Sequence, residues 1–239
     1  MIKPASANIL QIFTVAICVL PFALAVAYPL GSLLPMRWPV TSALFWDAGL
    51  SFLFFMQHSG MVRRRFRTWL AGFVPPNFYS AIYAIASGAA LTLVVALWQT
   101  TEIRLLEFQG AWLWVARGCG GMAIVVFVYS VYALRSFDPF GLAPIRAYMR
   151  ESQMQTPKFV VQGPYQWVRH PLYSCVIVLI WSCPELTADR LLLNVIWTAW
   201  ICGATVLEET DLRNEFGKAY QDYCSRVPML VPWRGRVQS

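Results

Sequence analysis

Charged residues are scarce in this chain. Only 13% of its 239 residues are Asp, Glu, Lys or Arg, whereas a soluble globular domain carries about 25%. Together with a hydrophobic content of 58% and long apolar runs, this deficit indicates an integral membrane protein. The length fits one polytopic domain and leaves no room for a separate soluble catalytic domain. Any chemistry must therefore use loops and helix ends at the membrane surface.

Histidine is also scarce, and cysteine occurs without a metal-binding pattern. The two histidines, His58 and His170, are too few for a multi-histidine metal site, and we expect no bound metal. The six cysteines form no CxxC pair, and most lie in apolar segments, where Cys behaves as a small hydrophobic residue. A disulfide framework is not expected. The basic residues, with a net charge of +7, form no continuous stripe, so we expect contact with a lipid bilayer and no nucleic acid.

The apolar runs predict an all-α fold, a polytopic membrane helix bundle with about five to six transmembrane segments. The last two, Leu172–Cys183 and Leu191–Leu207, should form a hairpin. The first of these arms is too short to cross a bilayer of about 30 Å alone, so we expect it to be tilted or partly re-entrant. The earlier runs are Ile9–Leu34, Val40–Met56, Tyr79–Trp98 and Ala111–Leu134.

The distribution of charge predicts the orientation. Arginine and lysine gather after the second run, between the fourth and fifth runs, and in the C-terminal tail, whereas the opposite loops are poor in positive charge. The positive-inside rule then places both termini in the cytoplasm, as in a multi-pass protein of a bacterial inner membrane. The first run is longer than a signal-peptide core, and we interpret it as a retained span. We divide the single domain into N-terminal helices (1–135) and a C-terminal part (136–239).

Ionisable residues gather at the cytoplasmic end of the predicted hairpin. The segment Gly163–Tyr173 contains a turn, then Arg169 and His170, directly before a proline that suits the first turn of a helix. The second arm ends at Glu208 and continues into a polar, aromatic helix. Hairpin topology and the charge rule therefore bring these groups to one membrane surface, where the C-terminal helix is also cytoplasmic.

The residues alone leave two interpretations of this cluster. Arg, His, Tyr and Trp favour the headgroup zone, so the segment before the hairpin could be an interfacial anchor. The acids after it could lie on a solvated helix, with Glu209 and Arg213 as an i,i+4 pair. Alternatively, a carboxylate there could bind a cationic ligand. His58 at the end of the second run is either a site residue or a simple helix terminus.

The order of these short motifs resembles a known signature. Gly-Pro-Tyr and Arg-His-Pro-Leu-Tyr precede the hairpin, and Glu-Glu-x-x-Leu-x-x-x-Phe-Gly-x-x-Tyr-x-x-Tyr and Val-Pro-x-x-x-Pro follow it. This pattern, over roughly residues 158–232, resembles the integral-membrane methyltransferases typified by isoprenylcysteine carboxyl methyltransferase. The first half, with Gln57-His58-Ser59, Arg63, Tyr83 and Trp98-Gln99, is similar to bacterial methanethiol S-methyltransferases and to NnrU-type membrane proteins.

The resemblance implies S-adenosylmethionine as the cofactor. The positions that match the family's cofactor contacts are Lys158, Phe159, Val160, Tyr165, His170, Pro171, Leu172, Tyr173 and Glu208. As catalytic residues it suggests His170, Arg169 and Tyr173. A general base for the acceptor could be His170, Tyr173 or His58, and the sequence does not choose among them.

The resemblance also bears on the methyl acceptor. The prenylcysteine enzymes place an arginine four residues before the first Glu of the pair, where this chain has Ala204. This difference favours a small, lipid-soluble acceptor, most simply a thiol such as methanethiol converted to dimethyl sulfide. The alternatives are carboxyl O-methylation of isoprenylcysteine, N-methylation of a phospholipid, and a non-catalytic NnrU-like accessory protein.

Overall fold

A computed structural model describes residues 12–17, 20, 33–134, 138, 142–150, 159 and 161–235 of the chain. Contacts within the chain fall into two units. One consists of Met1–Thr101 and Asp138–Thr156, the other of Glu102–Phe137 and Pro157–Ser239. Of the first predicted apolar run, only residues 12–17, 20, 33 and 34 are described, and residues 12–17 are helical. The rest of that run, Lys158 and Val160 lie outside the described residues.

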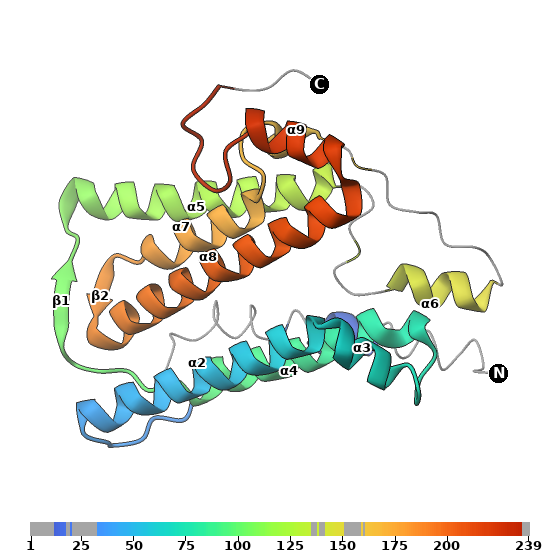
Figure 1. Cartoon of the computed structure of the whole chain (residues 1–239). Coiled ribbons are helices and arrows are strands. Elements are labelled where there is room, and N and C mark those ends of the chain that lie inside the picture. Colours follow the sequence, from blue (N-terminus) through green and yellow to red (C-terminus); the bar gives the residue numbers. More distant parts are fainter. Residues whose placement is uncertain are drawn as a thin grey trace. The chain divides into compact units, whose positions relative to one another are not determined.

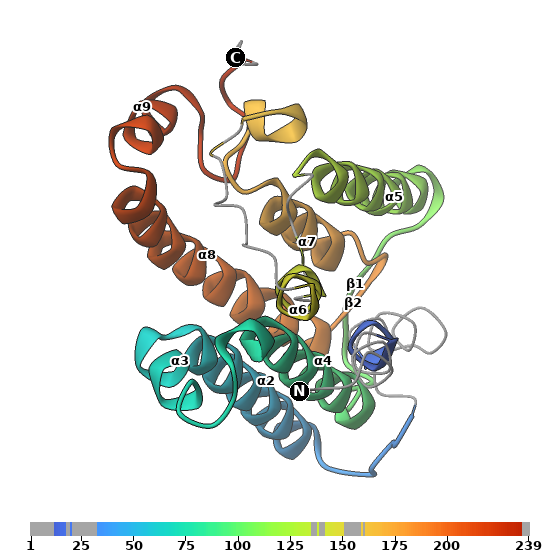
Figure 2. The ribbon, with the colours of Figure 1, turned by 90° about the vertical axis from the view of Figure 1, so that its right-hand side faces the viewer.

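The first unit contains a pair of long helices that lie side by side (Figures 1 and 2). At one end of the pair, Asp47 is buried, and its carboxylate accepts the backbone N–H of Gln99 at 2.9 Å. Near the other end, the ring of His58 contacts the Tyr83 hydroxyl (Nε2 to oxygen, 2.8 Å) and the Ser87 hydroxyl (Nδ1 to oxygen, 3.2 Å). The elements of this unit are α2 (Val40–Val62), α3 (Arg64–Leu70), η1 (Pro76–Phe78), α4 (Tyr79–Leu97) and α6 (Leu142–Met149).

The second unit contains the predicted hairpin. Its first arm is α7 and its second is α8, which runs without a break beyond the apolar stretch to Phe216. Helix α5, which the sequence grouped with the N-terminal helices, packs along α7 (Figures 1 and 2). The elements are β1 (Arg104–Glu107), α5 (Gly110–Ala133), η2 (Gly163–Gln166), α7 (Pro171–Trp181), β2 (Glu185–Thr187), α8 (Ala188–Phe216) and α9 (Lys218–Arg226).

Two short strands, which the sequence did not predict, complete the hairpin. Strand β1 precedes α5, strand β2 lies in the turn between α7 and α8, and the two pair antiparallel. In addition, the N–H of Phe108 donates to Pro184 (2.9 Å) and that of Ala188 to Ile103 (3.0 Å). These bonds satisfy backbone groups of the segment that follows the short helix α7. A chain that lengthens a short arm with extended residues near a bilayer needs such partners, because lipid supplies none.

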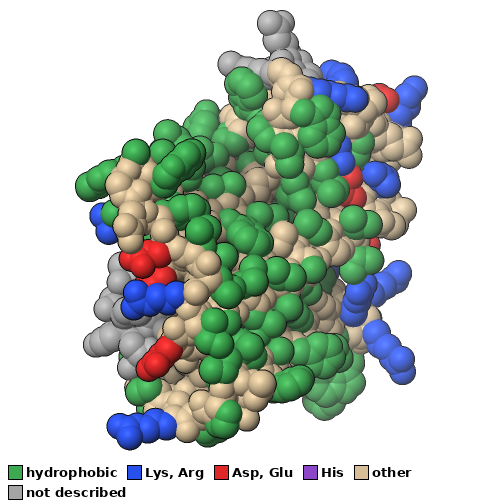
Figure 3. All heavy atoms as spheres, turned by 90° about the vertical axis from the view of Figure 1, so that its left-hand side faces the viewer, with side chains coloured by type: hydrophobic (Ala, Val, Ile, Leu, Met, Phe, Trp, Pro, Cys, Tyr) green, Lys and Arg blue, Asp and Glu red, His purple; other side chains and the backbone are tan. Residues whose placement is uncertain are grey.

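In the part of the chain that the structure describes, four helices are long and apolar enough to cross a membrane: α2, Pro76–Leu97, α5 and α8, with α7 as a shorter apolar helix. Large apolar side chains on these helices are exposed, among them Phe45 at 81% and Trp112 at 69%. Hydrophobic side chains cover much of the face drawn in Figure 3, and Lys and Arg lie mainly at its margins. The expected all-α polytopic membrane bundle is confirmed.

A glycine sets the turn that leads into the hairpin. Gly163 begins η2 with φ +58°, a left-handed conformation that is costly for other residues. A Cβ built on it would lie 3.0 Å from the Ala133 Cβ and 3.3 Å from the Tyr129 ring, both on α5. Gly163 therefore allows the turn to approach α5 closely.

We expect Gly163→Ala to lower the free energy of unfolding by roughly 1–3 kcal/mol, because it combines left-handed strain with a steric clash. Thermal unfolding in detergent would measure the effect. Gly203→Ala is the matched control, because Gly203 lies within α8 and its added Cβ meets nothing within 4 Å. That variant should be neutral or slightly stabilised. Equal unfolding temperatures for the two variants would contradict the assigned role of Gly163.

Candidate functional site

The site is built where a loop enters α7. Pro171 is the first residue of the helix and His170 is its N-cap. The backbone just before the helix is held by the segment after α9, here named the C-terminal strap (residues 227–230). The N–H of Arg169 donates to Pro228 (2.9 Å) and that of His170 to Met229 (3.1 Å). The strap therefore holds the backbone of Arg169 and His170 through these two hydrogen bonds, much as a neighbouring strand would.

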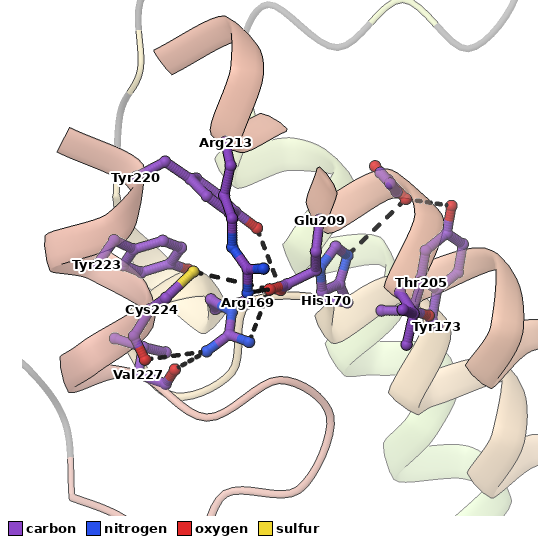
Figure 4. Close-up of polar contacts among 12 residues, drawn as sticks. Arg169, His170, Tyr173, Thr205, Glu209, Arg213, Tyr220, Tyr223, Cys224 and Val227 are labelled. Carbon is purple, nitrogen blue, oxygen red and sulfur yellow. Dashed lines mark hydrogen bonds and ion pairs between the residues drawn. The ribbon is translucent and has the colours of Figure 1, made fainter. Parts of the chain in front are cut away.

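The carboxylate of Glu209 is the centre of the polar network (Figure 4). Its side chain is only 4% exposed. One oxygen accepts Arg169 Nε at 2.6 Å and His170 Nε2 at 3.0 Å, and the other accepts Arg169 Nη2 at 2.9 Å. The Tyr220 hydroxyl and Arg213 Nη2 donate at 3.2 Å each. Buried charge is tolerated only when it is paired and hydrogen-bonded in this way.

Arg169 connects this carboxylate to the end of α9. Its remaining nitrogen, Nη1, donates to the carbonyls of Cys224 (3.2 Å) and Val227. Burial opposes its charge, but the hydrogen bonds and the charge of Glu209 outweigh burial and raise the pKa of Arg169. Burial, followed by the charge of Glu209, raises the pKa of the Tyr220 phenol. Arg169 is therefore a cation and Tyr220 a neutral donor, and both face Glu209.

The neighbouring Glu208 lies in a different environment. Its side chain is 43% exposed. One of its oxygens accepts the Tyr173 hydroxyl at 2.7 Å and lies 3.9 Å from His170 Nδ1. The rings of His170 and Tyr173 are stacked, with centroids 5.6 Å apart. The structure therefore brings the predicted His170, Tyr173 and Glu208 together, with an accessible carboxylate next to an imidazole and a phenol.

The other predicted cofactor positions fall into two groups. Tyr165 is close enough to Glu208 that burial, and then the charge of Glu208, raise the pKa of its phenol. Its carbonyl accepts the Tyr223 hydroxyl at 2.6 Å. The ring of Phe159 instead packs in an aromatic cluster with Phe216, Tyr220 and Tyr223. Pro171 is buried and Leu172 half-buried, both at the start of α7.

The sequence missed the role of Glu209. Its i,i+4 pair with Arg213 was anticipated and is present at 3.2 Å, but the pair is the weaker part of its environment. The stronger part comes from Arg169, some 40 positions earlier. The signal that could have indicated it is a second acid beside the first, opposite an Arg-His pair. In this arrangement, the arginine of the pair can neutralise one of the two acids when both are buried, as Arg169 does for Glu209.

These features define a class: a helical multi-pass membrane protein with an ionisable site at the ends of a helical hairpin. The chain belongs to the NnrU protein family, whose model matches residues 48–211. This confirms the family resemblance noted from the motifs. No solved structure matches the chain.

Named relatives are bacterial enzymes and an animal protein. A methanethiol S-methyltransferase from a Pseudomonas species is 33% identical over 206 residues, covering 85% of this chain and 78% of the relative. One from Crocosphaera subtropica is 33% identical over 200 residues, covering 82% and 78%. Nurim from Mus musculus is more distant, at 26% identity over 190 residues, covering 73% and 70%.

We expect Arg169→Ala to lower the free energy of unfolding by about 3–5 kcal/mol, because it leaves the carboxylate of Glu209 buried without its bidentate partner. Arg213→Ala is the matched control. It removes the other cation on the same carboxylate, but Arg213 is 49% exposed, and an exposed i,i+4 pair contributes only about 0.2–0.5 kcal/mol. Denaturation in detergent mixtures would compare the two variants. Similar small losses in both would show that Arg169 is not the main partner.

Proposed function

We propose that this chain is an integral-membrane methyltransferase that transfers a methyl group from S-adenosylmethionine to a small thiol, most simply methanethiol, which gives dimethyl sulfide. Two findings support the proposal. The named bacterial relatives are methanethiol S-methyltransferases over most of the chain. The site also has a partly exposed carboxylate, Glu208, that could pair with a cationic cofactor.

The contrast between two adjacent carboxylates carries the proposal. Glu209 is buried and its charge is matched by Arg169 and Arg213. Glu208 is partly exposed, and among the described residues it has no Arg or Lys partner. A carboxylate held in place by a tyrosine but left without a cation is suited to bind one from outside. Glu208 is therefore the residue that we assign to the positive charge of the cofactor.

The residues around Glu208 fit the remaining groups of S-adenosylmethionine. When bound, the cofactor would supply an electrophilic methyl group on a positively charged sulfur. Tyr165 and Tyr173 offer hydroxyls for hydrogen bonding, and Tyr173 also orients Glu208. Lys158, Phe159, Val160, Pro171 and Leu172 are proposed as further contacts from the family resemblance. Arg169 is assigned a positioning role, because Glu209 and backbone carbonyls occupy its donors.

The acceptor must lose a proton. An alkyl thiol is largely protonated at neutral pH, and the thiolate is the nucleophile. His170 is the best placed base, because its Nδ1 lies on the side of Glu208 and Tyr173. We propose that this nitrogen takes the thiol proton. Tyr173 and His58 remain the alternative bases, and His58 belongs to the other unit.

A dry site next to the lipid favours this reaction. A thiolate and a sulfonium neutralise each other during methyl transfer, so the transition state needs less solvation than the reactants. The apolar helices that carry the site would admit a small apolar thiol from the bilayer. The charge distribution supports a bacterial inner membrane with the site facing the cytoplasm, where a water-soluble cofactor is available.

A ligand-binding membrane protein without catalysis is the second candidate, because the matching family description names no activity. It would bind S-adenosylmethionine without turnover. Carboxyl methylation of isoprenylcysteine and N-methylation of a phospholipid are the alternatives within the enzyme class. A panel of acceptors with methyl-labelled cofactor would separate these functions.

We expect Glu208→Gln to weaken S-adenosylmethionine binding by about 10- to 100-fold in protein reconstituted in lipid nanodiscs, as measured by calorimetry. This is about 1.4–2.8 kcal/mol. It is less than the roughly 4 kcal/mol for two unit charges 4 Å apart at an effective dielectric of 20, because the carboxylate is partly exposed.

In membrane vesicles, methyl transfer to methanethiol should require the cytoplasmic face to be accessible to the cofactor.

Asp211→Asn is the matched control, because it removes an exposed acid from the following turn of the same helix. It should bind the cofactor as the parent protein does. Unchanged binding and methyl transfer in Glu208→Gln would remove the assigned site. Binding without transfer to any acceptor in the parent protein would favour the second candidate.

A further inference from the structure

The contact between Glu209 and His170 has a chemical consequence for the imidazole. Nε2 lies 3.0 Å from the Glu209 oxygen, and an ionised carboxylate can only accept hydrogen bonds. The proton of the neutral ring must therefore lie on Nε2. The buried position of both side chains, 6% and 4% exposed, keeps water from offering an alternative partner.

The opposite nitrogen is then a free acceptor. A neutral imidazole carries one N–H, so a proton on Nε2 leaves a lone pair on Nδ1. Nδ1 lies 3.9 Å from the Glu208 oxygen, too far for a hydrogen bond. The stacked Tyr173 ring restricts rotation of the imidazole. The lone pair is therefore held toward the accessible carboxylate.

We propose that Glu209 is a positioning residue that fixes the tautomer of His170, so that Nδ1 is the basic nitrogen of the site. This inference rests on the proposed function, in which Nδ1 accepts the thiol proton. In serine proteases, replacing the carboxylate that holds the catalytic histidine lowers kcat by roughly 10⁴, through the wrong tautomer. Glu209 has the same relation to its histidine here, with Arg169 and Arg213 matching its charge.

The chain has only two histidines, so nitrogen NMR of ¹⁵N-histidine-labelled protein resolves both rings, and His170→Gln assigns them. At alkaline pH we expect the neutral His170 ring to carry its proton on Nε2. In Glu209→Gln the amide oxygen should turn toward the two arginines and its NH₂ toward His170. The proton should then move to Nδ1, and kcat should fall at least tenfold while the KM for S-adenosylmethionine changes less than about threefold.

Tyr220→Phe is the matched control, because it removes another donor to Glu209 without touching the histidine. It should keep the parent tautomer, with the proton on Nε2. A proton on Nδ1 in the parent protein overturns the proposal, whether or not Glu209→Gln folds. An unchanged tautomer in a folded Glu209→Gln also overturns it. The expected tautomers without methyl transfer to any acceptor would refute the proposed function and leave the positioning of His170 established.

The first unit contains a cluster of arginines at α3. Between Asp47 and Glu102 the chain has no acidic residue, but it has four arginines at and around α3. Arg67 places its guanidinium 4.6 Å from the centroid of the Tyr79 ring. Among the described residues no hydrogen bond or ion pair engages its side chain. A guanidinium that lies over a ring and makes no hydrogen bond has N–H groups available to an anion.

The surroundings of Arg67 match one lipid group. A cavity of about 60 Å³ is lined by Arg67, Tyr79 and an apolar wall that includes Leu70 and Val74. One water needs about 10–15 Å³ on this measure, so the cavity has room for a phosphate-sized group. Trp69 and Phe73, which contact each other and are 57% and 72% exposed, suit the headgroup zone beside it.

We infer that Arg67, with the other α3 arginines, binds the phosphate of an anionic phospholipid. Nanodiscs of phosphatidylcholine with a minor fraction of phosphatidylglycerol provide the probe, and native mass spectrometry counts the retained lipid. Arg67→Gln should weaken retention of phosphatidylglycerol about fivefold, the effect of one arginine near an anionic surface. Arg226→Gln, at the end of α9, is the matched control and should bind as the parent does.

Equal retention in both variants would overturn the lipid site. Preferential loss of phosphatidylglycerol in Arg67→Gln, with phosphatidylcholine unchanged, would support it. Displacement of the lipid by millimolar inorganic phosphate would also overturn it, because the free anion would then be the ligand.

Discussion

The site depends on one buried charge, the carboxylate of Glu209. It is removed from water at the end of α8, where it accepts bonds from the loop before α7, from α8 itself and from α9. A single unpaired carboxylate in that position would cost several kcal/mol. The pairing with Arg169 offsets this cost and at the same time joins the loop before α7 to α8, some 40 positions later in the chain. The positions of His170 and Glu208, which neighbour Arg169 and Glu209 in the chain, follow from this pairing.

Helix geometry places the two adjacent glutamates in different environments. Consecutive residues on an α-helix point about 100° apart, so Glu209 can face α9 and the C-terminal strap while Glu208 faces Tyr173 and the opening of the site. The same separation explains why the two carboxylates have different partners. Glu209 is paired with arginines of the protein, whereas Glu208 lies beside the Tyr173 phenol and the His170 imidazole. In the proposed function, the carboxylate assigned to the cofactor is thus supported by a structural one at the next position.

Much of the fold could be predicted from the sequence, because apolar run length and proline position act locally. The start of α7 at Pro171 and the long second arm followed from such signals. The pairing of β1 with β2 could not be predicted, because each strand is short and their partners are some 80 positions apart. The grouping of His170, Tyr173 and Glu208 followed from hairpin topology. The inward turn of Glu209 did not, since it depends on packing by α9 and the strap.

The depth of the site follows from the lengths of the two arms. From Leu191 to Glu208 there are 17 residue steps (208 minus 191), or about 26 Å at 1.5 Å each, close to the roughly 30 Å of the hydrocarbon core. Helix α7, with 11 residues, rises only about 16 Å, and residues 182–187, which end in strand β2, must supply the remainder. Their pairing with β1 makes that extension possible without unsatisfied backbone groups. The carboxylate and the imidazole therefore meet near the boundary of the apolar layer. In the proposed function, a thiol dissolved in lipid and a cofactor dissolved in water would both reach this place.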